Sequence, residues 1–407
     1  MHAASYEAVA EVFRAEAGHL TTSLVRILGD FDLAEEIVQD TLLIALERWP
    51  VEGIPRRPGA WLHTVARRLA INRLHRDARY RDKLALLAAP SGRREPDDRL
   101  RLIFTCCHPA LGREAQVALT LRAVGGLTTT EIAHALVMSE AAVAQRIVRA
   151  RRKIVQAGIP YQVPSDDVIP ERLNEVLTVL YLVFNEGHLA SGGATPMRRD
   201  LVDDAIWLTQ LVCRLLPREP EPMGLLALMK LHSARAASRF DSAGNLVLLR
   251  DQDRSLWDGR MIADAIGLIE GAAALRRPGP FQLEAAIAAC HAEAVSFDST
   301  DWPQILALYD MLLGLAPSAV ARLNRAIALR MVRGPEAALA EVDRLARELD
   351  GYYLFHATRG ELLSELGSRE QARAAQLRAL ELTDNVAERS LLARRLGGVP
   401  SDERALQ

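Results

Sequence analysis

The stretch that most constrains the fold is Leu127–Ile154, because its pattern is that of two short helices joined by a tight turn. Apolar residues recur at helical spacing in both halves, and positions 137–138 interrupt them. We expect Thr129 or Thr130 to cap the first helix and Ser139 to precede the second, since a hydroxyl oxygen accepts an unpaired backbone N–H there. The outer face of the second helix carries Gln145, Arg146, Arg149, Arg151 and Arg152. A DNA-binding helix-turn-helix is one interpretation, and a helical hairpin with a solvated basic face is the other.

Length and composition indicate an all-α protein of several domains. The chain has 407 residues, which is enough for two to four domains of about 100–200 residues each. Ala, Leu and Arg dominate and only 5% of the residues are aromatic. These are good helix formers, and the β-branched and aromatic clusters that mark strands are scarce. The net charge of −2 identifies no partner by itself.

The cysteines and the N-terminus bear on the compartment. The four cysteines have no CxxC spacing and no disulfide framework, which fits a reducing cytoplasm. We find no signal-peptide pattern and no apolar run of about 18 residues, so we expect a cytoplasmic protein that does not span a membrane. Cys106 and Cys107 with His108 are a weak metal motif, because neighbouring helical residues point in different directions. We therefore expect no metal and no cofactor.

Two helices of opposite charge are predicted before the central stretch. Asp32–Trp49 has an apolar stripe and an acidic opposite face, which is either a solvated surface or a docking surface for a basic partner. A Pro/Gly loop, Pro50–Gly59, separates it from a basic helix over Ala60–Arg79. The segment from Arg56 to Lys83 contains nine basic residues and only two acidic ones. A local excess of this kind is typical of proteins that contact a phosphate backbone.

The C-terminal part is predicted to be helical, with a weak 34-residue repeat. Ala326, Leu329, Ala338 and Leu345 recur 34 residues later as Gly360, Leu363, Ala372 and Ala379. The period matches tetratricopeptide repeats, although their aromatic positions are mostly missing, and chance periodicity is the alternative. A second open alternative concerns the NEGH segment. Its Asn185, Glu186 and His188 are either a helix cap or, with His232 or His291, a metal or catalytic site.

Taken together, the parts resemble a bacterial sigma factor of the extracytoplasmic-function type. DLAEEIVQDTLLIALERW is similar to the polymerase-binding part of region 2, and PGAWLHTVARRLAINRLHRDAR is similar to the promoter-melting part. LTTTEIAHALVMSEAAVAQRIVRARRKI is similar to region 4. YLVFNEGH and ARLNRAIAL resemble blocks of a subgroup with a tetratricopeptide-like C-terminal extension. The sequence departs from this family at Val137, where the family usually has Gly, and at Ala141, where it often has Gly. Because a positive φ is unfavourable for Val, we expect a turn of slightly different shape before the second helix.

The resemblance implies a domain order. We expect a region 2 helical bundle over residues 1–84, a linker over 85–98 and a region 4 helix-turn-helix over 99–158. A second linker over 159–170, a helical extension domain over 171–300 and tetratricopeptide-like repeats over 301–407 follow.

The resemblance also implies two sets of site residues and no catalytic ones. The expected contacts to core polymerase are Glu35, Glu36, Gln39, Asp40, Leu43 and Leu46. The expected contacts to DNA at the minus-ten element are Arg56, Arg57, Trp61, Arg67, Arg68, Asn72, Arg73 and Arg76, with Trp61 favoured as a core residue. In the minus-thirty-five element Gln145 would read adenine and Arg146 guanine, while Ser139, Arg149, Arg151 and Arg152 belong to the same DNA-facing helix.

The expected function is therefore that of a sigma factor, with core RNA polymerase and promoter DNA as partners. The extension would regulate it in cis or through a protein partner. The alternative is a free-standing helix-turn-helix regulator with a tetratricopeptide-like partner-binding domain. An enzyme is disfavoured, because a Gly-rich phosphate loop, HExxH and a nucleophile elbow are all missing from the sequence.

Overall fold

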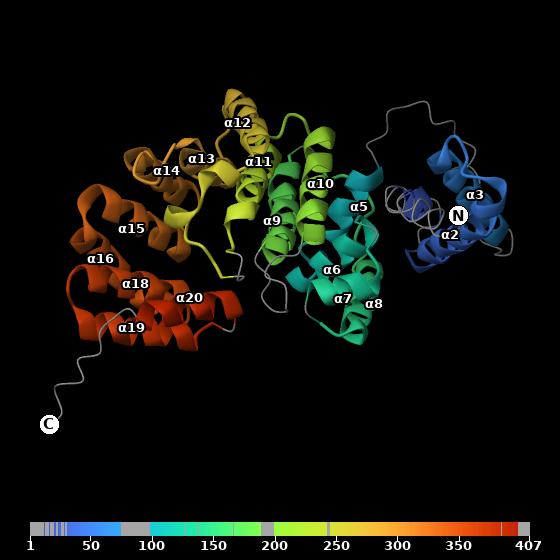
Figure 1. The fold of residues 1–407 in the computed structure, drawn as a ribbon. Coiled ribbons are helices and arrows are strands. Elements are labelled where there is room, and N and C mark those ends of the chain that lie inside the picture. Colours follow the sequence, from blue (N-terminus) through green and yellow to red (C-terminus); the bar gives the residue numbers. More distant parts are fainter. Residues whose placement is uncertain are drawn as a thin grey trace. The chain divides into compact units, whose positions relative to one another are not determined.

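A computed structural model shows a helical protein (Figure 1) and describes residues 31–74, 98–125, 127–136, 138–165, 167–188, 199–241, 245–383 and 385–397, with isolated positions between 12 and 28. No β-strand occurs in these ranges, where the only extended pairing is a single bridge between Phe240 and Leu246. The all-α prediction is confirmed. The chain divides into two compact units, unit 1 over Met1–Val183 and unit 2 over Phe184–Gln407.

The helices of unit 1 are α2 Phe31–Glu52, α3 Pro58–Leu74, α5 Asp98–Cys106, α6 Arg113–Ala123, α7 Thr129–Ala135, α8 Glu140–Gln156 and the first part of α9 Ile169–His188. Unit 2 takes the rest of α9 and continues with α10 Arg199–Leu215, α11 Pro220–Ala234, α12 Gly259–Ala274, α13 Pro280–Glu293, α14 Trp302–Leu315, α15 Ala319–Arg333, α16 Pro335–Asp343, α17 Ala346–Leu349, α18 Tyr353–Glu365, α19 Arg369–Glu381 and α20 Val386–Gly397. Short 3-10 turns cover Ala236–Ser238, Leu249–Asp251 and Arg254–Leu256.

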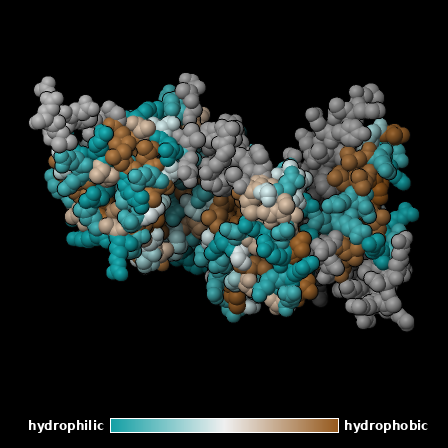
Figure 2. All heavy atoms as spheres, turned by 90° about the horizontal axis from the view of Figure 1, so that it is seen from below, coloured by the Kyte–Doolittle hydropathy of each residue, from teal (hydrophilic) through white to brown (hydrophobic). Residues whose placement is uncertain are grey.

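Hydrophilic side chains cover most of the face in Figure 2, and hydrophobic ones occur there in small patches. Among the described helices, none is long and apolar enough to cross a membrane. The apolar residues are instead used between helices, as each amphipathic helix buries one face against its neighbours.

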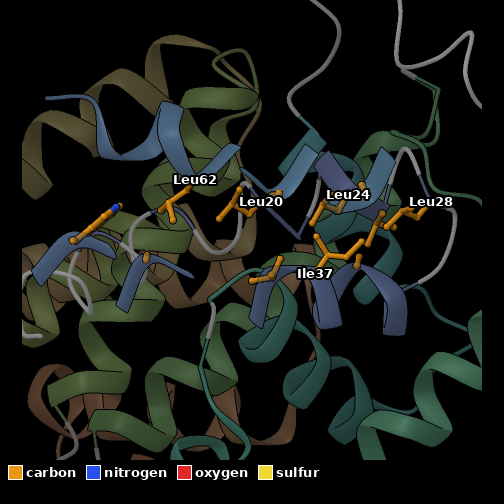
Figure 3. Packing of buried hydrophobic residues seen from close by; sticks show 12 residues of the cluster. Leu20, Leu24, Leu28, Ile37 and Leu62 are labelled. Carbon is orange, nitrogen blue, oxygen red and sulfur yellow. The ribbon is translucent and has the colours of Figure 1, made fainter. Parts of the chain in front are cut away.

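The first core joins α2 and α3 to the segment before them. Leu20, Leu24 and Leu28 recur every four residues and are buried together with Ile37 of α2 and Leu62 of α3, and their side chains meet between the helices (Figure 3). The remaining buried members are Val25, Ala34, Val38, Ala45, Trp49, Ala66 and Ala70. The apolar stripe predicted for Asp32–Trp49 is therefore confirmed as the buried face.

The loop between these helices is shorter than predicted. α2 runs through Pro50 to Glu52, and the N–H of Gly53 donates to the Trp49 carbonyl at 3.0 Å. Gly53 has φ +83°, a left-handed conformation that favours glycine, so it ends the helix where the sequence placed the middle of a loop. α3 already begins at Pro58 and is described as far as Leu74. The rest of the predicted helix, including Arg76, lies outside the described residues.

The helix-turn-helix forms as predicted, with one correction at its start. The cap of α7 is Thr128, one or two residues earlier than expected. Its hydroxyl accepts the Glu131 N–H at 3.1 Å, and the Glu131 carboxylate accepts the Thr128 N–H at 2.7 Å, which is a capping box. Ser139 caps α8, whose buried face is Val143, Ile147, Ala150 and Ile154. Val137 lies outside the described residues.

The first part of α9 packs on the helix-turn-helix module. The Arg172 guanidinium donates to the Phe104 carbonyl of α5 at 2.7 Å, and Arg113 of α6 pairs with Glu175 at 2.8 Å. Thr105 also donates to the Pro160 carbonyl at 3.3 Å. The chain that follows α8 is thus tied back to α5 and α6 within unit 1.

Most helices of unit 2 pack on the helix that follows them, and α11 packs on both α12 and α13. α13 packs on α14, α15 on α16 and α18 on α19, and all eight positions of the predicted 34-residue repeat are buried. The turns at Gly334 and Gly367 have φ values of +89° and +78°, as expected for the glycines between repeated helices. The period therefore corresponds to helical hairpins with small residues where the helices cross.

Gly224 gives a test of this close packing. A Cβ at position 224 of α11 would lie 2.6 Å from the backbone N and 2.8 Å from the Cα of Gln282 in α13, so α11 and α13 would have to separate. We expect Gly224→Ala to lower the free energy of unfolding by about 1–3 kcal/mol, as overpacking does. Urea titrations monitored by circular dichroism measure this change in the free energy of unfolding.

Gly267→Ala in α12 is the matched control, because a Cβ there meets nothing within 4 Å. It should raise stability by roughly 0.5–1 kcal/mol through helix propensity. Equal effects of the two substitutions would contradict the close α11–α13 contact.

Candidate DNA- and polymerase-binding surfaces

The exposed face of α8 carries most of the residues predicted to contact DNA. Gln145, Arg149 and Arg152 are exposed, and Ser139 is exposed at the N-terminus, where its hydroxyl accepts the Ala142 N–H at 3.2 Å. The buried stripe of α8 lies on the other side, so these side chains project together. A helix with such a face is suited to a major groove, in which amides and guanidiniums can bond base edges.

Arg146 is half-buried and already partnered. It pairs with Glu114 of α6 at 2.7 Å, and its guanidinium lies 3.1 Å from the Met138 sulfur. The Glu114 side chain is 76% exposed. An exposed ion pair contributes little to stability, so exchanging this carboxylate for another acceptor costs little.

Arg151 is not on the outer face, which corrects the sequence-based expectation. Its side chain is 12% exposed and its guanidinium lies 2.5 Å from the carboxylate of Glu35 in α2. The same carboxylate also pairs with Arg122 of α6. The Glu35 side chain is 18% exposed. Because it pairs with both arginines, it joins α2 to α6 and α8. Burial lowers the pKa of Arg122, and the nearby charge of Arg151 lowers it further.

The predicted minus-ten residues lie along α3 and the turn before it. Arg56, Arg57, Arg68 and Asn72 are exposed, as is Arg67. Arg73 is exposed but pairs with Glu36 of α2 at 3.0 Å. Trp61 is half-buried against Trp49, with ring centroids 5.4 Å apart in an edge-to-face arrangement, so its ring is part of the core packing.

The predicted polymerase-binding residues divide into two groups. Glu36, Gln39 and Asp40 are exposed on α2, and Leu43 is 56% exposed, which is unusual for a leucine of this helix. Leu46, by contrast, packs partly on the buried cluster. Glu35 points to the arginines described above. α2 therefore presents an acidic surface that includes the exposed Leu43.

The surroundings of the cysteines disfavour the thiolate form. Cys106 and Cys107 are buried, and burial raises the pKa of Cys107 to about 12. Burial likewise raises the pKa of Cys213 to about 12 and that of Cys290 to about 11. The thiolate is the nucleophilic form of cysteine, so these positions are not activated for nucleophilic chemistry. Within the described ranges, no three His, Cys, Asp or Glu side chains come together as metal ligands.

The NEGH segment ends α9. Asn185 is exposed and His188 is buried, stacked on Phe184 with ring centroids 5.2 Å apart, and the Glu186 side chain lies outside the described ones. His188 and His232 are 5.5 Å apart between centroids. Burial, together with Arg239, lowers the pKa of His188 to about 3, so its imidazole is neutral.

Arg122 and Arg172 are the interacting residues that sequence reasoning missed. Arg122 lies in the last turn of α6, where a basic residue is favoured by the helix dipole in any protein. Arg172 lies in the first turn of α9, which a Pro-rich segment separates from α8. Their partners are distant in sequence, so no local pattern identified them.

Comparison with known proteins finds the same order of parts. Residues 12–80 match sigma-70 region 2, residues 101–154 match sigma-70 region 4, and residues 172–273 match a family of unknown function, DUF6596. An uncharacterized protein of Rhizobium meliloti is 45% identical over 387 residues, which is 92% of each chain.

Two relatives from Mycobacterium tuberculosis are similar over the N-terminal part. The probable extracytoplasmic-function RNA polymerase sigma factor SigI is 28% identical over 166 residues, 38% of this chain and 57% of that protein. The extracytoplasmic-function RNA polymerase sigma factor SigL is 34% identical over 143 residues, 32% of this chain and 80% of that protein. With regions 2 and 4 in this order and a helical extension after them, the chain belongs to the extracytoplasmic-function sigma factors of RNA polymerase.

Proposed function

We propose that this chain binds core RNA polymerase through α2, binds promoter DNA through α3 and α8, and directs transcription initiation from the cytoplasm. The observation that carries the proposal is that one compact unit holds an exposed acidic face on α2 and two exposed basic faces on α3 and α8. The acidic face suits a basic protein surface, and the basic faces suit phosphates.

The two DNA-binding faces have different roles in this proposal. The α3 face holds the opened minus-ten strand by its phosphates, since arginines there outnumber residues that read bases. The α8 face reads the minus-thirty-five duplex, with Gln145 and Arg146 on base edges and Arg149 and Arg152 on phosphates. When DNA binds, the Arg146 guanidinium leaves its ion pair with Glu114 and bonds a base edge instead.

We further propose that the C-terminal extension regulates this activity in cis or through a protein partner. The supporting contacts are those of α9 with α5 and α6, because Arg172 and Glu175 bring the start of the extension onto region 4. Stacked helical hairpins such as those of unit 2 are also a common scaffold for binding proteins.

The alternative is a helix-turn-helix regulator that acts without polymerase. It gives no role to the exposed Leu43 within the acidic face of α2. Size-exclusion chromatography with core polymerase separates the two functions: co-elution supports the sigma factor, and its absence supports the free regulator.

Run-off transcription tests the main function. Core polymerase with the full chain should initiate from a template pool of randomised promoter sequences and enrich one pair of elements. A fragment ending at His188 keeps the α9 contacts with region 4, whereas a fragment ending at Pro160 loses the Arg172 bond to Phe104. We expect the two fragments to differ in stability, and the longer one to report the effect of removing the rest of the extension.

Initiation by none of the three chains would contradict the proposed sigma function. Equal initiation by the full chain and the longer fragment would contradict regulation in cis.

The reading of the minus-thirty-five element is tested by a pair of α8 variants. Gln145→Ala should relax the preference at one base pair of the enriched element by about 1–3 kcal/mol, because it removes a base contact. Arg152→Ala should weaken binding to all sequences alike and reduce the salt slope by about one. Binding of each variant holoenzyme to matched and mismatched duplexes, at several salt concentrations, measures both effects.

Glu35 gives a test of the contact between α2 and region 4. Because Glu35 pairs with Arg122 and Arg151, Glu35→Gln should make these guanidiniums available to phosphates. We expect the polymerase-free chain to bind non-specific duplex about 3–10-fold more tightly, with a salt slope steeper by about 0.9 per new phosphate contact. Fluorescence anisotropy measures both quantities.

Glu47→Gln is the matched control for Glu35. It removes the same charge from the same helix at an exposed position. If both variants raise DNA affinity equally, the effect is one of net charge, and the contact of Glu35 with region 4 does not restrain DNA binding.

A further inference from the structure

Unit 2 contains a half-buried group of basic side chains that the sigma factor function does not use. It forms where the end of α9, α11 with the turn after it, the segment before α12 and α13 come together. Its members, named the Arg/His cluster, are His188, His232, Arg235, Arg239, Arg254 and His291.

The members contact one another, and Arg235 and Arg254 both lie over the ring of Trp257. Arg235 bonds His232 Nδ1 at 3.0 Å, and Arg239 bonds His188 Nε2. Arg254 donates to the carbonyl of Ala294 at 2.8 Å and to that of His291. The guanidinium carbons of Arg254 and Arg235 lie 4.5 and 5.9 Å from the centroid of the Trp257 ring.

Two arginines of the cluster have no carboxylate beside them. Burial lowers the pKa of Arg235 to about 10, and the charges of Arg239 and Arg254 add to this effect. The charge of Glu388 acts on Arg239, whereas no described carboxylate acts on Arg235 or Arg254 in this way. Charges that are removed from water are ordinarily paired, so these two arginines lack a negative partner.

Three buried nitrogens next to each other also lack a hydrogen-bond partner. They are Arg254 Nη2, His291 Nδ1 and Trp302 Nε1. Arg254 contacts the His291 carbonyl, and the His291 and Trp302 rings meet edge to face with centroids 5.2 Å apart. An unpaired buried polar group costs about 1–3 kcal/mol. Arg254 Nη2 and Trp302 Nε1 are donors, and His291 Nδ1 donates in one of its two tautomers, so the three nitrogens suit a ligand that accepts hydrogen bonds.

A pocket of about 750 Å³ has His291 and Trp302 in its wall, and Arg254 lies behind His291. Its apolar lining continues over α14 and α15 with Phe297, Ile305, Ile327 and Met331. This volume is typical of sites for small molecules, which are mostly apolar with a few placed polar groups. On its other side Arg250, Arg330 and Arg395 share the carboxylate of Glu361, and Arg330 also pairs with Glu365.

We propose that unit 2 binds a small organic acid, with its carboxylate or phosphate group between Arg254, His291 and Trp302 and its apolar body in the adjoining pocket. The acid supplies the missing negative charge and accepts the three unused hydrogen bonds. Because the nitrogens are buried, the His291 and Trp302 rings rotate toward the pocket to admit it. A cation is excluded by the three guanidiniums of the cluster.

This inference goes beyond the proposed function, because binding is measured without polymerase or DNA. A failure of transcription therefore leaves it standing, and a failure of binding leaves the sigma function standing.

The test is calorimetry on the full chain with matched probes, supported by tryptophan fluorescence. Phenylacetate and phenyl phosphate carry the two acidic groups, phenylacetamide is the neutral match, and acetate and inorganic phosphate lack the apolar body. We expect the tighter-binding of the two aromatic acids to bind at least tenfold more tightly than phenylacetamide. It should also bind at least tenfold more tightly than the corresponding small ion, which is acetate for phenylacetate and inorganic phosphate for phenyl phosphate. The comparison of the two aromatic acids identifies the acidic group.

The variants locate the site. Arg254→Gln and His291→Gln should each weaken binding at least tenfold, while Arg322→Gln, which breaks an exposed pair with Glu348 outside the pocket, should not. Circular dichroism checks that each variant folds. If Arg254→Gln does not fold, the His291→Gln variant tests the site alone, because His291 Nδ1 makes no hydrogen bond that the substitution could remove.

The proposal would be overturned by no binding of either aromatic acid, by equal binding of the amide, or by tight binding that both cluster variants retain. Binding of bare phosphate as tightly as phenyl phosphate would also overturn it, because the pocket would then contribute nothing.

Discussion

Every helix of this chain depends on burying one face against another helix, because isolated helices of this length are marginal in water. The chain does so largely with small residues. Ala34, Ala66, Ala326 and Ala372 are fully buried, and Gly224 and Gly360 sit where helices touch. Close approach of backbones replaces the large aromatic side chains that this sequence mostly lacks. The same geometry recurs in both units, and it fixes which helix faces remain exposed.

The elements of the fold could be predicted from local patterns. The stripe of Asp32–Trp49, the two helices of Leu127–Ile154 and the helical hairpins of the repeat follow from periodicity and from glycine turns. The errors are also local. Pro50 was expected to end a helix that in fact continues to Glu52, and the hydroxyl that caps α7 belongs to Thr128. Neighbouring threonines are equivalent in sequence, and only the path of the chain selects one of them.

The candidate sites could be predicted only in part, and the reason is sequence distance. Exposed residues such as Gln145 and Arg152 follow from the helical face on which they lie. Glu35 and Arg151 also lie at positions that a helical wheel leaves outside, yet they meet each other across 116 residues. The Arg/His cluster likewise joins His188 to Arg239 across 51 residues. Periodicity reports which face is buried locally and carries no information on which distant charge will meet it.

The contacts of α9 bear on how such a chain is inherited. The family of unknown function begins at residue 172, yet Arg172 and Glu175 are engaged with α5 and α6 of the sigma module. A recombination event at that boundary would join an extension to a foreign region 4 and leave the Phe104 carbonyl and Arg113 without these partners. The extension and region 4 are therefore expected to pass between genomes as one piece. Among related chains, a reversal of charge at Arg113 should accompany a reversal at Glu175.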